Sequence, residues 1–295
     1  MNNQDSEWQG YAFSIGASAL FGLLPWYLQW LSPLGGNLLF GHRLLVQLVC
    51  ALVIVIAIRQ LPALIACLRD PRRLSLLLLT APLIALQWWI FFWAPVNGYT
   101  VDMAMGYFLL PLTMAFTGRM VFSERLRPLQ WLALLVAIIG VSLELAYTGT
   151  FSWVTLLVCL GYPPYFILRR RLPDDTRLNF AAENVLLLPV GIALVAIAAN
   201  NGERLLPDAD NGLVLVFGAG AIGTVAMLMF LAASTRLSLT VFGLLGYLEP
   251  VLLMAVALFV LGESISHEQA LSYGFFTCAI ALVIGDVLLR LNRPW

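Results

Sequence analysis

Ionisable side chains are scarce in this sequence, with 11% of residues charged, so those within long apolar segments are where chemistry is expected. His42 and Arg43 lie near the start of the apolar segment 36–58. A guanidinium seven residues into such a helix lies about 10 Å from its end. Arg43 could bind an anion or carboxylate or form a gating salt bridge, or it could be a structural pair or snorkel outward. His42 could carry a proton, although a hydrogen-bonded structural histidine is favoured.

Glu249 is the acid that lies deepest in an apolar segment, in "GYLEPVLL" about eleven residues from either end of 239–261. The next charge along the chain is Glu263. A carboxylate in apolar surroundings is either protonated or paired with a cation. Glu249 could therefore couple protons or bind a cationic solute, or it could form a structural hydrogen bond across a kink at Pro250.

Aromatic side chains are dense in "WYLQW" at 26–30 and "QWWIFFW" at 87–93. Trp26, Trp88, Tyr107 and Tyr247, together with Gln87, could line an aromatic cavity that binds amphipathic or cationic solutes. The alternative is a position at the membrane interface, where Trp and Tyr are enriched, and this is the expectation for Trp30 and Trp93.

The remaining acids lie nearer the ends of the apolar segments or in loops. We expect interfacial or capping roles for Asp102, Glu144, Glu183 and Asp286. Glu124 and Glu263 occupy matching loop positions, where we expect them to cap helices or tie loops.

Composition defines the class of protein. The 295 residues are 61% hydrophobic, with a mean hydropathy of +0.90, which predicts a polytopic membrane protein. Zero net charge argues against a nucleic-acid partner. The four cysteines are far apart and form no CxxC pair, so no disulfide framework, metal site or cofactor is indicated. No basic residue precedes the first apolar segment, so we expect that helix to be retained rather than cleaved as a signal peptide.

Apolar segments of about 20 residues, the length that crosses a bilayer, occur ten times. They are 10–30, 36–58, 74–93, 99–121, 129–147, 151–168, 179–199, 211–232, 239–261 and 268–290. Fourteen of the sixteen arginines fall in alternate loops and the C-terminal tail, one (Arg204) falls on the other side, and Arg43 falls within a segment. This split places both termini in the cytoplasm.

A shift of 139 residues aligns the two halves of the chain. It carries Gly22 and Pro25 onto Gly161 and Pro164, and it also pairs Pro111 with Pro250, Glu124 with Glu263 and Gln130 with Gln269. Since five helices per half is an odd number, the halves 1–147 and 148–295 must have opposite orientations. The sequence thus predicts an all-α integral membrane protein of ten transmembrane helices in two inverted five-helix repeats. Such repeats with proline-interrupted helices are typical of secondary transporters.

Several motifs resemble those of a known family. These are "GHR" at 41–43, the run from Trp93 to Ala133 that contains "GYFLLPLT" and "FSERLRPLQW", "YFILRR" at 165–170, "ENVLLLP" at 183–189 and "GLLGYLEPVLLMAVALFVLGE" at 243–263. Nearly the whole chain resembles the RarD-type permeases, in the EamA branch of the drug/metabolite transporter superfamily. The resemblance implies ten helices in two inverted halves, cytoplasmic termini, and export or exchange of small molecules.

The predicted function is a secondary transporter of small organic solutes in the bacterial cytoplasmic membrane, working by alternating access through a central cavity. Its partners would be the solute and the lipid bilayer; proton coupling and a homodimer are both compatible with the sequence. Amino acids, other metabolites, amphipathic drugs and aromatic compounds all suit such a cavity.

Two other classes of protein are alternatives. One is an intramembrane enzyme, but the sequence has no HExxH, GxSxG or paired catalytic acids and only two histidines. Gly218, Gly220 and Gly223 match a dinucleotide-binding pattern, yet they lie within an apolar segment, where close helix packing explains them better. The other is a membrane sensor or assembly subunit without a transport cycle.

Overall fold

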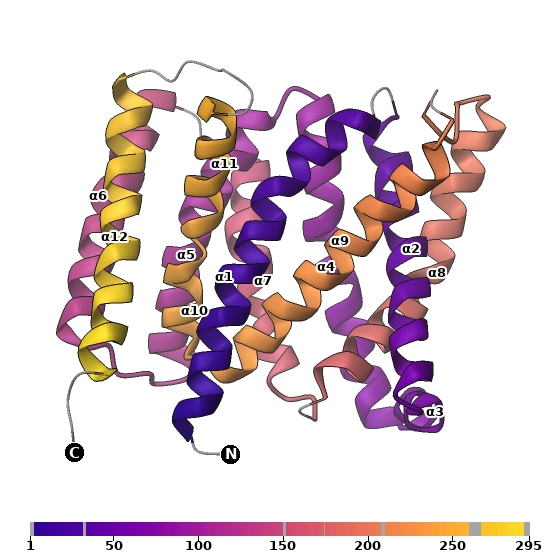
Figure 1. The fold of residues 1–295 in the computed structure, drawn as a ribbon, viewed down its shortest axis with the longest axis horizontal. Coiled ribbons are helices and arrows are strands. Elements are labelled where there is room, and N and C mark those ends of the chain that lie inside the picture. The colour runs from indigo at the N-terminus through magenta and orange to yellow at the C-terminus, as the bar shows by residue number, and fades with distance from the viewer. Residues whose placement is uncertain are drawn as a thin grey trace. The chain divides into compact units, whose positions relative to one another are not determined.

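The computed structural model describes residues 3–31, 34–149, 152–173, 175–207, 210–259 and 267–291, and the regular structure of these residues is helical (Figure 1). The α-helices are α1 (Asn3–Leu28), α2 (Gly36–Ala57), α3 (Leu61–Arg69), α4 (Pro71–Val96), α5 (Thr100–Val121), α6 (Pro128–Thr148), α7 (Trp153–Arg169), α8 (Thr176–Asn200), α9 (Gly212–Arg236), α10 (Leu239–Leu245), α11 (Leu248–Phe259) and α12 (His267–Leu291). A short 3-10 helix, η1 (Gln29–Leu31), follows α1.

Eight helices of the described chain are long and apolar enough to cross a membrane. They are Ser6–Leu31, Gly36–Ala57, Pro71–Ala94, Thr100–Val121, Pro128–Thr148, Thr176–Asn200, Gly212–Arg236 and Ala270–Leu289. Two shorter apolar helical segments, Trp153–Arg169 and Leu239–Leu252, lie where the sequence predicts the sixth and ninth spans. The prediction of an all-α membrane protein is confirmed, with eight candidate spans where the sequence predicts ten.

The ninth apolar segment is broken, whereas the sequence predicts one helix over 239–261. α10 ends at Leu245 and α11 begins at Leu248. Pro250 has no N–H to donate to the carbonyl of Gly246, and that carbonyl instead accepts from the N–H of Glu249 at 3.3 Å. By contrast, Pro111 lies inside the continuous helix α5. The two prolines that the shift of 139 residues pairs thus lie inside one uninterrupted helix and just after one helix break.

Helix α3 lies where a loop is predicted between the second and third spans. Arg59, with a φ of 57°, ends α2, and Asp70 caps α4 by accepting the N–H of Arg72. Between them, α3 turns Leu64 and Cys67 inward and leaves Leu61 and Ile65 exposed. Burial raises the pKa of the Cys67 thiol, which makes this cysteine a poor nucleophile at neutral pH.

The chain forms two compact units, each built from segments of both predicted halves. Unit 1 comprises Met1–Leu23, Val101–Pro163 and Ala233–Trp295, and unit 2 comprises Leu24–Thr100 and Pro164–Ala232. The boundary between the repeats, at 147 and 148, stays a prediction.

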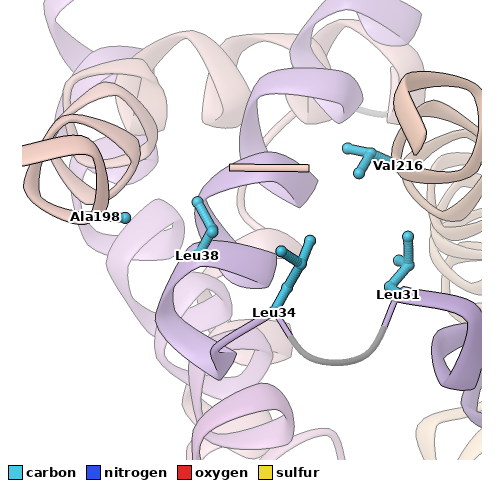
Figure 2. Close-up of a cluster of buried hydrophobic side chains, with 5 residues drawn as sticks. All are labelled: Leu31, Leu34, Leu38, Ala198 and Val216. Atoms are coloured by element: carbon cyan, nitrogen blue, oxygen red, sulfur yellow. The ribbon is translucent and has the colours of Figure 1, made fainter. Parts of the chain in front are cut away.

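Within unit 2, α2 packs along α8 (Figure 1). Gly41 permits this approach, since a Cβ there would lie 3.0 Å from Leu194. Figure 2 shows the apolar cluster at one end of this packing, formed by Leu31, Leu34, Leu38, Ala198 and Val216. Leu31 and Val216 from this cluster also contribute to the wall of the candidate site described below.

Within unit 1, α6 packs along α12 (Figure 1). Gly140 permits close contact with Phe276, because a Cβ at this position would lie 2.9 Å from the ring. Gln130 of α6 donates to the carboxylate of Asp286 on α12 at 3.0 Å, and both side chains are buried. This hydrogen bond satisfies an acid that would otherwise be costly to bury.

Candidate functional site

Arg43 is the charged residue at the centre of the candidate site in unit 2. Its side chain is only 6% exposed. The guanidinium carbon lies 5.2 Å from the ring centroid of Trp88 and 5.7 Å from that of Phe92, both on α4. Each ring face attracts the positive charge, and a cation–π contact of this kind contributes about 0.5–2 kcal/mol. The two rings therefore hold the guanidinium inside the helix packing rather than at a helix end.

Helix α9 faces Arg43 with glycines. A Cβ on Gly223 would lie 3.4 Å from the guanidinium carbon, and one on Gly220 would collide with Val46 of α2. Gly218 likewise has no room for a Cβ, because Tyr27 occupies that space. The three glycines lie on one continuous helix, which confirms that the dinucleotide-like pattern serves close helix packing.

His42 is tied to the backbone of the segment that follows α8. Its Nε2 lies 2.8 Å from the carbonyl oxygen of Leu205. Because a carbonyl only accepts, Nε2 carries the hydrogen, and Nδ1 is the nitrogen left to gain or lose a proton. The favoured expectation of a hydrogen-bonded histidine is confirmed.

A hollow opens beside His42 and Arg43. It is partly open to the surroundings and has room for about one water molecule. Its other lining residues are Leu24, Leu28, Leu31, Leu39, Phe92, Val216, Ala219 and Gly220. The wall is therefore apolar except where α2 contributes one imidazole and one guanidinium.

Two buried amide side chains lie on the helices that carry Arg43 and Trp88. Gln47 follows Arg43 by one helical turn on α2, and Gln87 precedes Trp88 on α4; neither side chain is exposed. Among the described residues, neither amide atom of Gln47 has a hydrogen-bond partner. Leaving a buried polar atom unsatisfied costs about 1–3 kcal/mol, so such atoms require an explanation such as a ligand or ordered water.

The other predicted site residues are not among those that line this hollow. Trp26 is 36% exposed and contacts Trp30 at a ring-centroid distance of 4.9 Å, and it does not line the hollow. Tyr107, Tyr247 and Glu249 belong to unit 1. Of the predicted residues, the structure thus brings together His42, Arg43 and Trp88.

Tyr247 and Glu249 lie at the break between α10 and α11. Tyr247 is fully buried, donates its hydroxyl to the carbonyl oxygen of Phe108 at 3.0 Å, and stacks on Phe276 at 4.8 Å. Glu249 is half-buried in the first turn of α11. The break therefore gives this carboxylate a helix N-terminus, which favours negative charge, instead of the middle of a helix.

Comparison with known proteins decides the family. The EamA-like transporter family matches residues 147–285. The chain is 39% identical to the chloramphenicol-sensitive protein RarD of Pseudomonas aeruginosa, over 97% of this chain and 96% of that protein. The chain belongs to the RarD-type permeases of the EamA transporter family.

Other relatives agree with this assignment. An uncharacterized transporter of Pasteurella multocida is 34% identical over 97% of this chain and 99% of its own length, and protein RarD of Escherichia coli is 28% identical over 97% of each. A solved crystal structure superposes with a TM-score of 0.69 at 17% identity, covering 98% of this chain and 99% of that one, and shows the same fold. This RarD-type permease is thus a multi-pass protein of the bacterial inner membrane, in a family of transporters.

An ion pair within unit 2 was not anticipated. Arg169 at the end of α7 donates to Glu183 of α8 at 2.7 Å, and Tyr165 contacts both side chains. All three are buried, so the expectation of an interfacial or capping role is wrong for Glu183. The pairing depends on the turn between α7 and α8, which sequence spacing alone does not define. The motifs "YFILRR" and "ENVLLLP", which contain these residues, were the available signal.

The expectation for the loop acid Glu124 is confirmed. Its carboxylate accepts the N–H of Leu239 at 2.7 Å and both the N–H and the hydroxyl of Thr240 at 2.9 Å. It therefore caps the N-terminus of α10 and ties the loop after α5 to it. Its predicted counterpart, Glu263, lies outside the described residues.

Proposed function

We propose that this RarD-type permease is a secondary transporter that exports or exchanges small organic solutes by alternating access through a central cavity. In this proposal, ten helices form two inverted five-helix repeats, 1–147 and 148–295, with both termini in the cytoplasm. Inverted repeats supply two equivalent arrangements of one framework, each open to a different side of the membrane.

One observation carries the proposal: the helices repeat with the same spacing as the sequence. Four helices of the first half, α2, α4, α5 and α6, begin at residues 36, 71, 100 and 128. Four helices of the second half, α8, α9, α10 and α12, begin at residues 176, 212, 239 and 267. A shift of 139 residues carries each of the first four starting positions to within two residues of its counterpart. Unit 2 consists of the segments Leu24–Thr100 and Pro164–Ala232, and the same shift carries the first residue of one to within one position of the first residue of the other. A duplication therefore accounts for both the elements and their grouping.

Flux through purified protein tests the transport proposal. The protein would be reconstituted in proteoliposomes with radiolabelled amino acids, aromatic acids and amphipathic drugs, with and without an imposed pH gradient. We expect saturable flux of at least one solute above that of protein-free liposomes. A sensor or assembly subunit would bind without flux, and an enzyme would convert its substrate in detergent without a second compartment; either result would contradict the proposal.

Glu249 is proposed as the proton-coupling group, because a carboxylate at a helix break is the acid placed deepest in an apolar segment. Glu249→Gln keeps the shape of the side chain and removes its charge. We expect flux driven by a pH gradient to fall to the level of exchange without a gradient, at unchanged expression. Unchanged pH-dependent flux would remove the coupling role.

A further inference from the structure

The hollow in unit 2 combines one fixed positive charge with an otherwise apolar wall. Arg43 carries that charge, and none of the ten residues lining the hollow is acidic. A guanidinium stays protonated at any physiological pH and presents five N–H donors in a plane. The wall would thus attract an anionic group and repel a cationic one.

The rings around Arg43 contact its guanidinium in a different way from a carboxylate. Trp88 and Phe92 contact the guanidinium as π faces, at 5.2 and 5.7 Å from their centroids. A π face attracts the cation, whereas a carboxylate provides lone pairs that match two parallel N–H groups. Rings and a carboxylate can therefore bind the same guanidinium together.

Helix α9 places small residues beside the guanidinium. Gly223 places no side chain beside the guanidinium, and Gly220 and Ala219 form the small-residue wall of the hollow. Leucines of α1, η1 and α2 and Val216 supply the apolar remainder. In this conformation the hollow has room for about one water molecule. A solute would therefore bind here only when the surrounding helices move apart.

We propose that the Arg43 hollow recognises the carboxylate of a small amphipathic acid with an apolar or aromatic body. This inference rests on the proposed transport function and names its substrate class. Arg43 contacts the carboxylate, His42 borders the head group from the neighbouring position on α2, and Trp88 and Phe92 hold the guanidinium in place. Of the solute classes compatible with the sequence, amphipathic acids fit this site and cationic amphiphiles do not.

Matched ligands test the charge preference directly. Binding of benzoate, phenylacetate and indole-3-acetate to the purified full-length protein in nanodiscs would be compared with that of their primary amides and of phenethylammonium, by isothermal titration calorimetry. We expect at least one carboxylate to bind ten times more tightly than its amide. The proposal is overturned if no carboxylate exceeds its amide, or if phenethylammonium binds most tightly.

Variants locate the binding at Arg43. Arg43→Gln should weaken carboxylate binding at least tenfold and leave the amide unaffected, and Arg43→Lys should retain part of the preference. Arg177→Gln, which removes an exposed arginine in the first turn of α8, is the control. If Arg43→Gln does not fold, Gly223→Ala fills the space beside the guanidinium, and it should also lower carboxylate affinity at an unchanged unfolding temperature. Equal affinities in wild type and Gly223→Ala or Arg43→Gln would overturn the proposal.

Flux separates this inference from the transport proposal. Carboxylate binding that depends on Arg43 but is never followed by flux would support the site and contradict the transporter. Carboxylate flux that persists unchanged in Arg43→Gln would support the transporter and contradict the site.

Discussion

Buried polar residues without hydrogen bonds lower the free energy of unfolding of this permease. Gln47 is the clearest case, since its amide is fully buried one turn beyond Arg43 and has no partner among the described residues. A residue kept for stability alone would be apolar here, because unsatisfied buried groups are costly. We interpret the amide as part of the solute path.

Gln47→Met tests this interpretation, because methionine keeps the length of the side chain and removes the amide. The unfolding temperature should stay the same or rise, since up to two unsatisfied groups of about 1–3 kcal/mol each are removed, while solute flux should fall several-fold. Leu48→Met, an apolar exchange at the next position, is the matched control and should change neither quantity. A marked drop in unfolding temperature for Gln47→Met would show that the amide is structural.

Arg169 and Glu183, unlike Gln47, satisfy each other in the interior, because their opposite charges form an ion pair. Glu183→Gln leaves the Arg169 charge buried without its partner carboxylate, and we expect it to lower the free energy of unfolding by about 3–5 kcal/mol. Replacing both residues by Met and Leu should recover most of that loss. Chemical unfolding in detergent measures this, and equal losses in the single and double variants would contradict a compensated pair.

At the scale of elements, the predicted helices match the observed ones where apolar length decides the structure. The segment 36–58 is α2 at Gly36–Ala57, and 129–147 is α6 at Pro128–Thr148. The nine-residue helix α3 is too short for a window of about 20 residues. The sequence predicts a kink at Pro250, but it does not predict that one helix ends at Leu245 and another begins at Leu248, because hydropathy does not register which backbone hydrogen bonds a proline removes.

The candidate site was predictable only in part, for a similar reason. A buried arginine in an apolar segment requires compensation, so Arg43 stood out from the sequence alone. Its contacts with Phe92 of α4 and Gly223 of α9 depend on how three helices are rotated against one another. The sequence pattern of a single helix does not determine how that helix is rotated against its neighbours.

The Glu124 cap makes its own prediction about an element. Glu124→Ala removes three acceptor contacts at the start of α10, and we expect a loss of about 0.5–2 kcal/mol in stability. Amide hydrogen exchange should accelerate over residues 239–242. Asp70→Ala, which removes the cap of α4, is the control and should accelerate exchange only near Arg72. Unchanged exchange over 239–242 in Glu124→Ala would show that the cap does not stabilise α10.

At the scale of the whole molecule, the transport proposal depends on the second half being inserted upside down. The exposed residues Arg59, after α2, and Glu203, after α8, occupy corresponding connections of the two halves. An inverted duplication puts these connections on opposite faces of the membrane, whereas a duplication without inversion puts them on the same face.

Accessibility labelling measures this directly. Arg59→Cys and Glu203→Cys would be made separately after replacing the native Cys50, Cys67, Cys159 and Cys278, and intact cells would be treated with a membrane-impermeant maleimide. We predict labelling at position 203 in intact cells, and labelling at position 59 only after the membrane is permeabilised. Labelling of both positions from the same face would contradict the inverted repeat and, with it, the alternating-access account.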